Sequence, residues 1–187
     1  MIPIPISSAI AGGLLWSKTP HKRGYELRCN GGIVGSLQRK SCWSSEFRAE
    51  SNAGTWKFRR TGWFRTGTEI TDQKSGARIA VFKPNWTGGG ILAFSDGMRF
   101  RLTYKGFWRP VWSVLADTGQ SILSIRPRNE AVELTGDVRL PEERLSLVAI
   151  FTWHIIRQIA EDAGASAAMA VVPNGDLLTA QRMRTAR

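Results

Sequence analysis

At 187 residues, the chain has the length of one ordinary domain and can bury a substantial core. Its hydrophobic content of 42%, with eight Trp and eight Phe, excludes the class of intrinsically disordered proteins. The formal net charge of +11 favours partners that carry phosphates, such as nucleic acids and anionic lipids. Two cysteines, Cys29 and Cys42, are too few for a disulfide scaffold, so a reducing compartment is expected.

The N-terminal segment, residues 1–22, is apolar in its first part, MIPIPISSAIAGGLLW. It lacks the cationic region of a signal peptide, and Pro3 and Pro5 come early. We therefore expect an extended arm at residues 1–22.

Residues 25–135 form short runs rich in β-branched and aromatic residues, separated by turn signals. The clearest turn is Asp96-Gly97, because Asp-Gly supplies the positive φ angles of a two-residue hairpin. The segment predicts eleven strands, with a twelfth in the short run DVRL: YELRC, IVGSLQ, EFRAES, TWKFRR, TEITDQ, ARIAVF, ILAFS, MRFRLTYK, VWSVLA, QSILSI and AVELT.

No helical pattern interrupts these strands, so the crossover helices of a parallel sheet are missing from the sequence. An antiparallel sheet of this size leaves exposed edges unless it closes into a barrel or folds into a sandwich.

The first helical signal comes late, at Leu140-Pro141-Glu142-Glu143, where Pro and two carboxylates suit a helix N-terminus. We expect a helix at about 141–162. Its segment LSLVAIFTWHIIRQIA is apolar on every side, which is typical of a helix buried in a core or in a membrane. Residues 164–187 have little core potential and a basic end, and we expect a flexible tail there.

The length of the apolar segment favours burial in protein over insertion in lipid. Its sixteen residues span roughly 24 Å, whereas the hydrocarbon layer is ~30 Å thick. Arg157, His154 and Gln158 also oppose insertion. We therefore expect a mainly β fold: a closed antiparallel barrel of about 12 strands around a central hydrophobic C-terminal α-helix, covering residues 23–163.

The chain resembles the tubby C-terminal-like superfamily, which includes tubby proteins, phospholipid scramblases and LURP-one-related proteins. The resemblance covers residues 25–163 and rests on YELRCNGGIVGSL, on ARIAVFKPNWTGGGILAFSDGMRFRLTYKGFW, and on LSLVAIFTWHIIRQIAED in the place of the family's core helix. It implies a barrel around that helix and, because the family includes phosphoinositide binders, recognition of lipid headgroups. The family's ligand-contacting cations do not map onto particular positions here.

Alternation along the predicted strands separates aromatic residues from cations. In 56–59 and 98–105 the aromatic side chains share one face and the cations the other, because successive side chains in a strand point to opposite sides. We predict an outward basic surface that binds anions; an ordinary solvated outer face is the alternative. The candidate residues are Lys57, Arg59, Arg60, Arg99, Arg101 and Lys105.

Signals for catalysis and metal binding are weak. His21 and His154 have no Ser, Cys or carboxylate partner by spacing, and we expect His154 to be a core residue with a hydrogen bond. No run of carboxylates has the spacing of a calcium site. We expect no enzymatic activity, no cofactor and no metal. Four tryptophans would be membrane anchors if exposed, but the barrel core or rim is the expected place for them: Trp63, Trp86, Trp108 and Trp112.

The hypothesis is thus a non-enzymatic binding module, cytoplasmic and peripheral at the membrane, whose basic surface binds anionic phospholipid headgroups. Besides a structural or protein-interaction barrel whose charge is incidental, two alternatives stay open. One is a scramblase-like membrane protein whose 145–160 helix contacts lipid. The other is a non-specific nucleic-acid-binding protein, although the sequence shows no recognition helix, zinc finger or RNA-binding signature.

Overall fold

The computed structural model describes residues 3–9, 13–19, 24–41, 44–62, 67–86, 89–106, 110–127, 131–134 and 140–170, without the side chains of 164–170. The chain divides into two compact units, Met1–Ile155 and Ile156–Arg187. The first unit contains a 3-10 helix, η1 (Ser7–Ala9), all the described strands and the first half of helix α1 (Glu142–Ala170).

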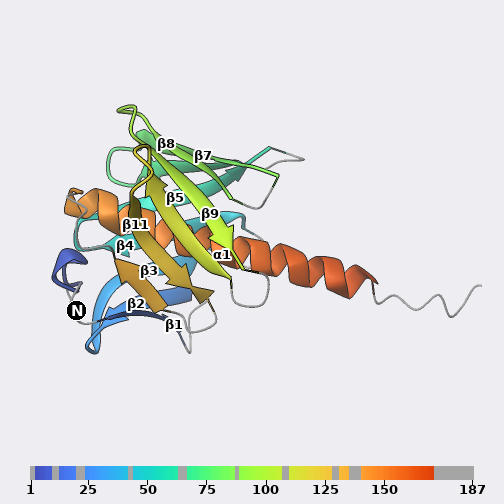
Figure 1. Cartoon of the computed structure of the whole chain (residues 1–187), viewed down its shortest axis with the longest axis horizontal. Helices are drawn as coiled ribbons and strands as arrows, with labels where there is room; N and C mark the ends of the chain where they lie inside the picture. Colours follow the sequence, from blue (N-terminus) through green and yellow to red (C-terminus); the bar gives the residue numbers. More distant parts are fainter. Residues whose placement is uncertain are drawn as a thin grey trace, which may run out of the picture. The chain divides into compact units, whose positions relative to one another are not determined.

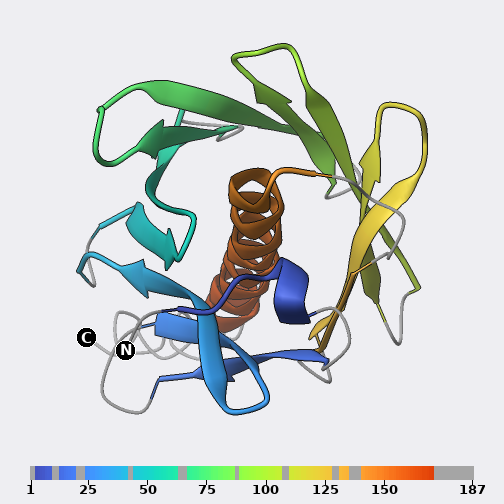
Figure 2. The same cartoon turned by 90° about the vertical axis from the view of Figure 1, so that its left-hand side faces the viewer.

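The described residues of the first unit form a closed antiparallel barrel of twelve strands (Figures 1 and 2). Each strand pairs with its neighbours in sequence, and β1 pairs with β12 to close the ring. The strands are β1 (Leu14–Lys18), β2 (Gly24–Cys29), β3 (Gly32–Arg39), β4 (Glu46–Ser51), β5 (Gly54–Thr61), β6 (Gly67–Asp72), β7 (Arg78–Pro84), β8 (Gly90–Phe94), β9 (Arg99–Lys105), β10 (Val111–Ala116), β11 (Ser121–Arg126) and β12 (Ala131–Leu134).

The fold class predicted from the sequence is confirmed, and the eleven predicted strands correspond to β2 through β12. The twelfth strand was misplaced. It is β1, inside the segment 1–22 that the sequence predicted to be an arm, and it pairs with β2 and β12. The run DVRL lies almost entirely outside the described residues. Closure by β1, which pairs with β2 and with β12 at Leu14↔Val132, removes the two edges that an open sheet of eleven strands would expose.

Turn chemistry sets the register of the hairpins. Asn30 and Gly31 both have positive φ, 47° and 80°, and form the two-residue turn between Cys29 and Gly32. The predicted hairpin at Asp96-Gly97 is present, but only Gly97 has positive φ among its residues, at 91°. Its turn is longer than two residues, because the Phe94 N–H donates to the carbonyl of Met98.

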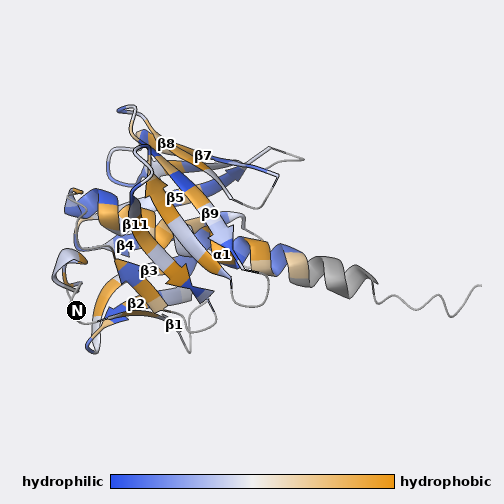
Figure 3. Cartoon of the chain, viewed as in Figure 1, coloured by the Kyte–Doolittle hydropathy of each residue, from blue (hydrophilic) through white to orange (hydrophobic). Residues whose placement is uncertain are grey.

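The first half of α1 lies inside the barrel (Figure 2). Hydrophobic and hydrophilic residues alternate along the strands, as Figure 3 shows, so one face of every strand meets this helix. The core-facing helix side chains are at most 5% exposed: Leu145, Leu147, Val148, Ala149, Ile150, Phe151, Trp153 and Ile155. Burial on all sides explains why this part of the segment carries no amphipathic pattern.

Four contacts hold the start of α1 against the barrel end. The backbone N–H groups of Ile6 and Ser7 donate to the carboxylate of Glu142 in the first helical turn. Arg144 donates to the carboxylate of Asp96 at 2.7 Å, and its guanidinium lies 3.9 Å from the centre of the Phe94 ring. The N-terminal segment therefore packs on the barrel instead of extending from it.

The helix runs further than the predicted 141–162, because α1 ends at Ala170. The predicted tail, 164–187, therefore begins inside the helix. Residues 171–187 lie outside the described residues.

Candidate anion-binding face

Four cations project from the outer face of β7 and β9, the two strands that flank β8. Residue Lys83 on β7 pairs with Ile91 on β8, and Ile91 pairs with Arg101 on β9. The backbones of Lys83 and Arg101 are thus two strand spacings, about 10 Å, apart. We define this group as the basic face: Lys83, Arg99, Arg101 and Lys105, all of them exposed.

The basic face has no acidic neighbours on its own strands. The strands β7, β8, β9 and β10 contain no Asp or Glu. Within the described part of the chain, none of the four cations forms an ion pair, although five other Arg residues and Lys40 do. Their positive charge is therefore directed to solvent without local compensation.

Ile91 lies among these cations, and two exposed aromatic side chains, Trp86 and Tyr104, lie near Lys83 and Lys105 at the end of the barrel. Ile91, between Lys83 and Arg101, is 46% exposed, and Trp86 in the β7–β8 hairpin is 87% exposed. Tyr104 is 46% exposed and stacks on Trp112 at a centroid distance of 5.1 Å. Such a mixture fits a partner with a charged surface and an apolar layer beneath it.

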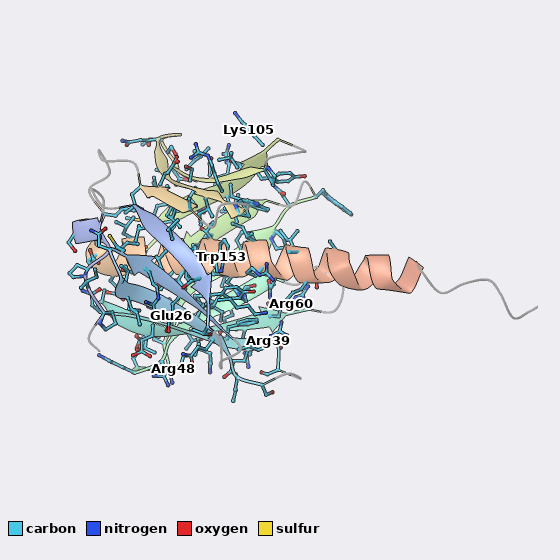
Figure 4. All side chains as sticks on the ribbon, turned by 90° about the horizontal axis from the view of Figure 1, so that it is seen from below. Glu26, Arg39, Arg48, Arg60, Lys105 and Trp153 are labelled. Carbon is cyan, nitrogen blue, oxygen red and sulfur yellow. The ribbon has the colours of Figure 1, made fainter. Side chains whose placement is uncertain are left out.

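Two other predicted candidates lie on a different side of the barrel. Figure 4 shows Lys105 and Arg48, which is the cross-strand partner of Lys57, on opposite sides. The outer face of β4–β6 is mixed in charge: Arg59 lies 3.4 Å from Glu69, and Arg48 is also paired, with Glu50 at 3.4 Å. A surface pocket there is lined by four cations, one carboxylate and two amides: Arg39, Lys40, Arg48, Lys57, Glu46, Gln38 and Gln73. The ion pairs make this side a weaker candidate for anion binding.

Arg60 was predicted to face outward, and this prediction is wrong. It follows Trp56 and Phe58 in the alternation of β5 and pairs with Thr68, whose side chain is fully buried. Arg60 is half-buried, and its charge reaches His154 inside the barrel. The strand continues its period of two through residue 60, which places this guanidinium on the inner face.

His154 is a core residue, as the sequence predicted, but the expected hydrogen bond is absent. Neither ring nitrogen has a hydrogen-bond partner among the described residues, and the side chain is 1% exposed. Its ring packs against Phe47 and Phe58, at centroid distances of 4.5 and 5.2 Å. Burial, and secondarily the charges of Arg60 and Arg39, lower the pKa of His154 to about 3, so the imidazole is neutral at physiological pH.

Sequence reasoning missed Lys83, and its expectation of a core or rim position for Trp86 left the exposure of this side chain open. The run RIAVFKP of β7 alternates, with Ala80 and Phe82 buried, and this pattern already assigns Lys83 to the outer face. Of the tryptophans considered as anchors, Trp112 is buried at 5% exposure, while Trp63 and Trp108 lie outside the described residues. Only in the structure does the exposure of Trp86 become visible, because it depends on the pairing of β7 with β8.

The described residues also bear on metal binding and on membrane-spanning helices. No group of three or more His, Cys, Asp or Glu side chains is placed to hold a metal ion. No described helix combines the length and hydrophobicity that crossing a membrane requires. Comparison of the chain with protein-family models, with curated proteins and with solved structures found no match.

Proposed function

We propose that this protein is a non-enzymatic binding module that docks peripherally, from the cytoplasmic side, on membranes rich in anionic phospholipid. One observation carries the proposal: the four cations of the basic face form no ion pair with any described residue, stand on strands without acidic residues, and have Ile91 exposed between them. The resemblance to the tubby C-terminal-like superfamily, which includes phosphoinositide binders, points to the same class of ligand.

The size of the electrostatic attraction is sufficient for reversible binding. Each Lys or Arg near an anionic membrane contributes about 1 kcal/mol, so the four cations together contribute about 4 kcal/mol. Because these side chains are exposed, added salt screens the attraction over a Debye length of ~10 Å at 0.1 M. Binding should therefore weaken steadily as ionic strength rises.

Lipid fits the basic face better than nucleic acid does. The cations stand on an outward strand surface and not in a channel that follows a phosphate backbone. The exposed side chain of Ile91 has no role in backbone phosphate binding, but it gains from contact with an acyl layer.

The test is co-sedimentation with phosphatidylcholine vesicles with and without phosphatidylserine. Replacing Lys83, Arg99, Arg101 and Lys105 by Gln should weaken binding to the anionic vesicles roughly a hundredfold or more, because about 4 kcal/mol of attraction is lost. A matched variant removes the same number of charges elsewhere: Arg28, Arg48, Lys57 and Arg59 to Gln. It should retain most of the binding, since three of these cations already have carboxylate partners.

Three results would contradict the proposal. The first is that wild-type protein binds vesicles with and without phosphatidylserine equally. The second is that the two fourfold variants lose the same amount of vesicle binding. The third is tight, salt-sensitive binding of single-stranded or duplex DNA together with no vesicle binding, which favours the nucleic-acid alternative. A parallel titration with vesicles containing a phosphoinositide, matched in charge, separates headgroup recognition from charge alone.

A further inference from the structure

The two ends of the barrel differ in chemistry. Hairpins alternate between the ends, so the β7–β8 connection lies at one end and the β8–β9 and β10–β11 turns lie at the other. The register places Gly90 opposite Leu102, and Tyr104 and Lys105 continue β9 beyond this level, toward the β7–β8 hairpin. We call this end, with Trp86, Tyr104, Lys83 and Lys105, the tryptophan end.

The opposite end carries carboxylates. Asp72 closes β6 there, Asp96 lies in the β8–β9 turn, and Asp117 follows β10. Glu142 and Glu143 begin α1 at the same end, where Arg144 pairs with Asp96. Within the described residues, the carboxylates of these turns thus lie away from Trp86, whereas Glu46, which begins β4 at the tryptophan end, is paired with Lys40 at 3.3 Å.

Trp86 is the most exposed large hydrophobic side chain of the described part of the chain, at 87%. Trp86 follows Pro84 and Asn85. The backbone N–H of Asn85 donates to the carbonyl of Gly89 at 2.9 Å and closes the base of the hairpin. A rigid hairpin base with an indole at its tip resembles the interfacial anchors of membrane proteins, because Trp prefers the headgroup level of a bilayer.

From this polarity we infer that the barrel docks end-on, with the tryptophan end facing an anionic phospholipid bilayer and Trp86 inserted at the headgroup level. Lys83 and Lys105 then contact the headgroups, Arg101 lies behind them, and Arg99 lies near the acidic end. Docking on the side of the barrel would instead bring all four cations to the membrane together. The inference rests on the proposed function and adds an orientation and an insertion site to it.

The first test compares Trp86→Ala with Met98→Ala. Met98, 39% exposed, is in the β8–β9 turn at the acidic end and serves as the matched control. We expect Trp86→Ala to weaken binding to phosphatidylserine vesicles roughly tenfold, with thermal unfolding unchanged because the side chain is exposed. Met98→Ala should remain within about twofold of wild type.

The second test measures whether the loss of vesicle binding decreases along β9, from Lys105 to Arg99. Lys105→Gln should weaken vesicle binding roughly fivefold, Arg101→Gln less, and Arg99→Gln least, since only cations within a Debye length of the surface are attracted. Insertion is measured independently, with phosphatidylserine vesicles whose acyl chains are brominated. Wild type should lose more Trp fluorescence than Trp86→Phe does, and the difference reports the depth of Trp86.

The outcomes distinguish the two ideas. If wild type binds the anionic vesicles but Trp86→Ala binds equally well, or Arg99→Gln is as harmful as Lys105→Gln, end-on docking is wrong and the proposed function stands. Equal quenching in wild type and Trp86→Phe also overturns the insertion. If wild type binds no vesicle, both ideas fail together.

Discussion

At the scale of single residues, His154 is a polar side chain that the barrel buries away from water. Its imidazole lies among aromatic rings with both nitrogens unpartnered in the described part of the chain. Folding lowers the pKa of His154 from 6.5 to about 3, mainly through burial and then through Arg60 and Arg39. Between these pH values the unfolded chain binds a proton that the folded chain does not bind.

The linkage predicts acid sensitivity with a definite sign. As pH falls from about 6.5 to about 3, the free energy of unfolding should decrease by about 1.4 kcal/mol per pH unit from His154, and the contribution should level off below that range. His154→Leu removes the titrating group and two unsatisfied nitrogens at similar volume. Urea unfolding of both proteins at several pH values measures the difference in slope.

At pH 7 we expect the unfolding free energy of His154→Leu to stay within about 2 kcal/mol of wild type, because lost aromatic contacts are offset by the removal of buried polar atoms. An unchanged pH slope in the variant would contradict the assignment of the acid sensitivity to His154.

Among elements, the contact of α1 with β3 sets how tightly the barrel closes on its helix. A Cβ at Gly35 would lie 2.8 Å from Cδ1 of Ile150 and 3.3 Å from the carbonyl oxygen of Glu50. Both distances are shorter than ordinary contact, and the core on either side is filled. Glycine at this position therefore permits the helix to lie against the strand.

Gly35→Ala is expected to destabilise the fold by about 1–3 kcal/mol through overpacking, measured by chemical denaturation. Ser36→Ala, the neighbouring position on the outer face, should change stability by less than about 0.5 kcal/mol. Adding Ile150→Val to Gly35→Ala removes the clashing methyl group and should recover part of the loss. Full tolerance of Gly35→Ala would show that the helix does not approach β3 this closely.

For the whole molecule, closure depends on a strand near the N-terminus. β1 makes the β1–β12 contact that turns an open sheet into a barrel, and the segment before it donates hydrogen bonds to Glu142 of α1. Without residues 1–18, β2 and β12 would become free edges, which are prone to intermolecular pairing.

We predict that deleting residues 1–18 abolishes cooperative thermal unfolding and produces soluble aggregates, whereas the shorter deletion of residues 1–3 leaves the transition in place. Calorimetry and size-exclusion chromatography measure the two effects. A deletion variant that remains monomeric with an unchanged transition temperature would restore the view of this segment as a peripheral arm.

Much of the fold was predictable because its signals are local. Turn residues such as Asn30 and Gly31 mark hairpins, and period-two alternation marks each strand face, so β2 through β12 and the enclosed helix followed from the sequence. β1 was missed because LLWSK is short and follows Pro- and Gly-rich chain, and only its pairing with β12 shows what it does. The candidate site was predicted in part: Arg99, Arg101 and Lys105 lie together, Lys57 and Arg59 lie elsewhere, and Arg60 faces inward.

By itself, the sequence determined the number of charges, the faces of most strands and the burial of residues 145–156, because alternation and hydrophobicity act between near neighbours in the chain; the end of the apolar segment, with Ile159 37% exposed, is not buried. Only the tertiary structure decided which cations share a surface and which of them carboxylates neutralise, because these depend on strand order around the ring. The same holds for Trp86: its exposure at one end of the barrel follows from the register of β7, β8 and β9, which no local pattern encodes.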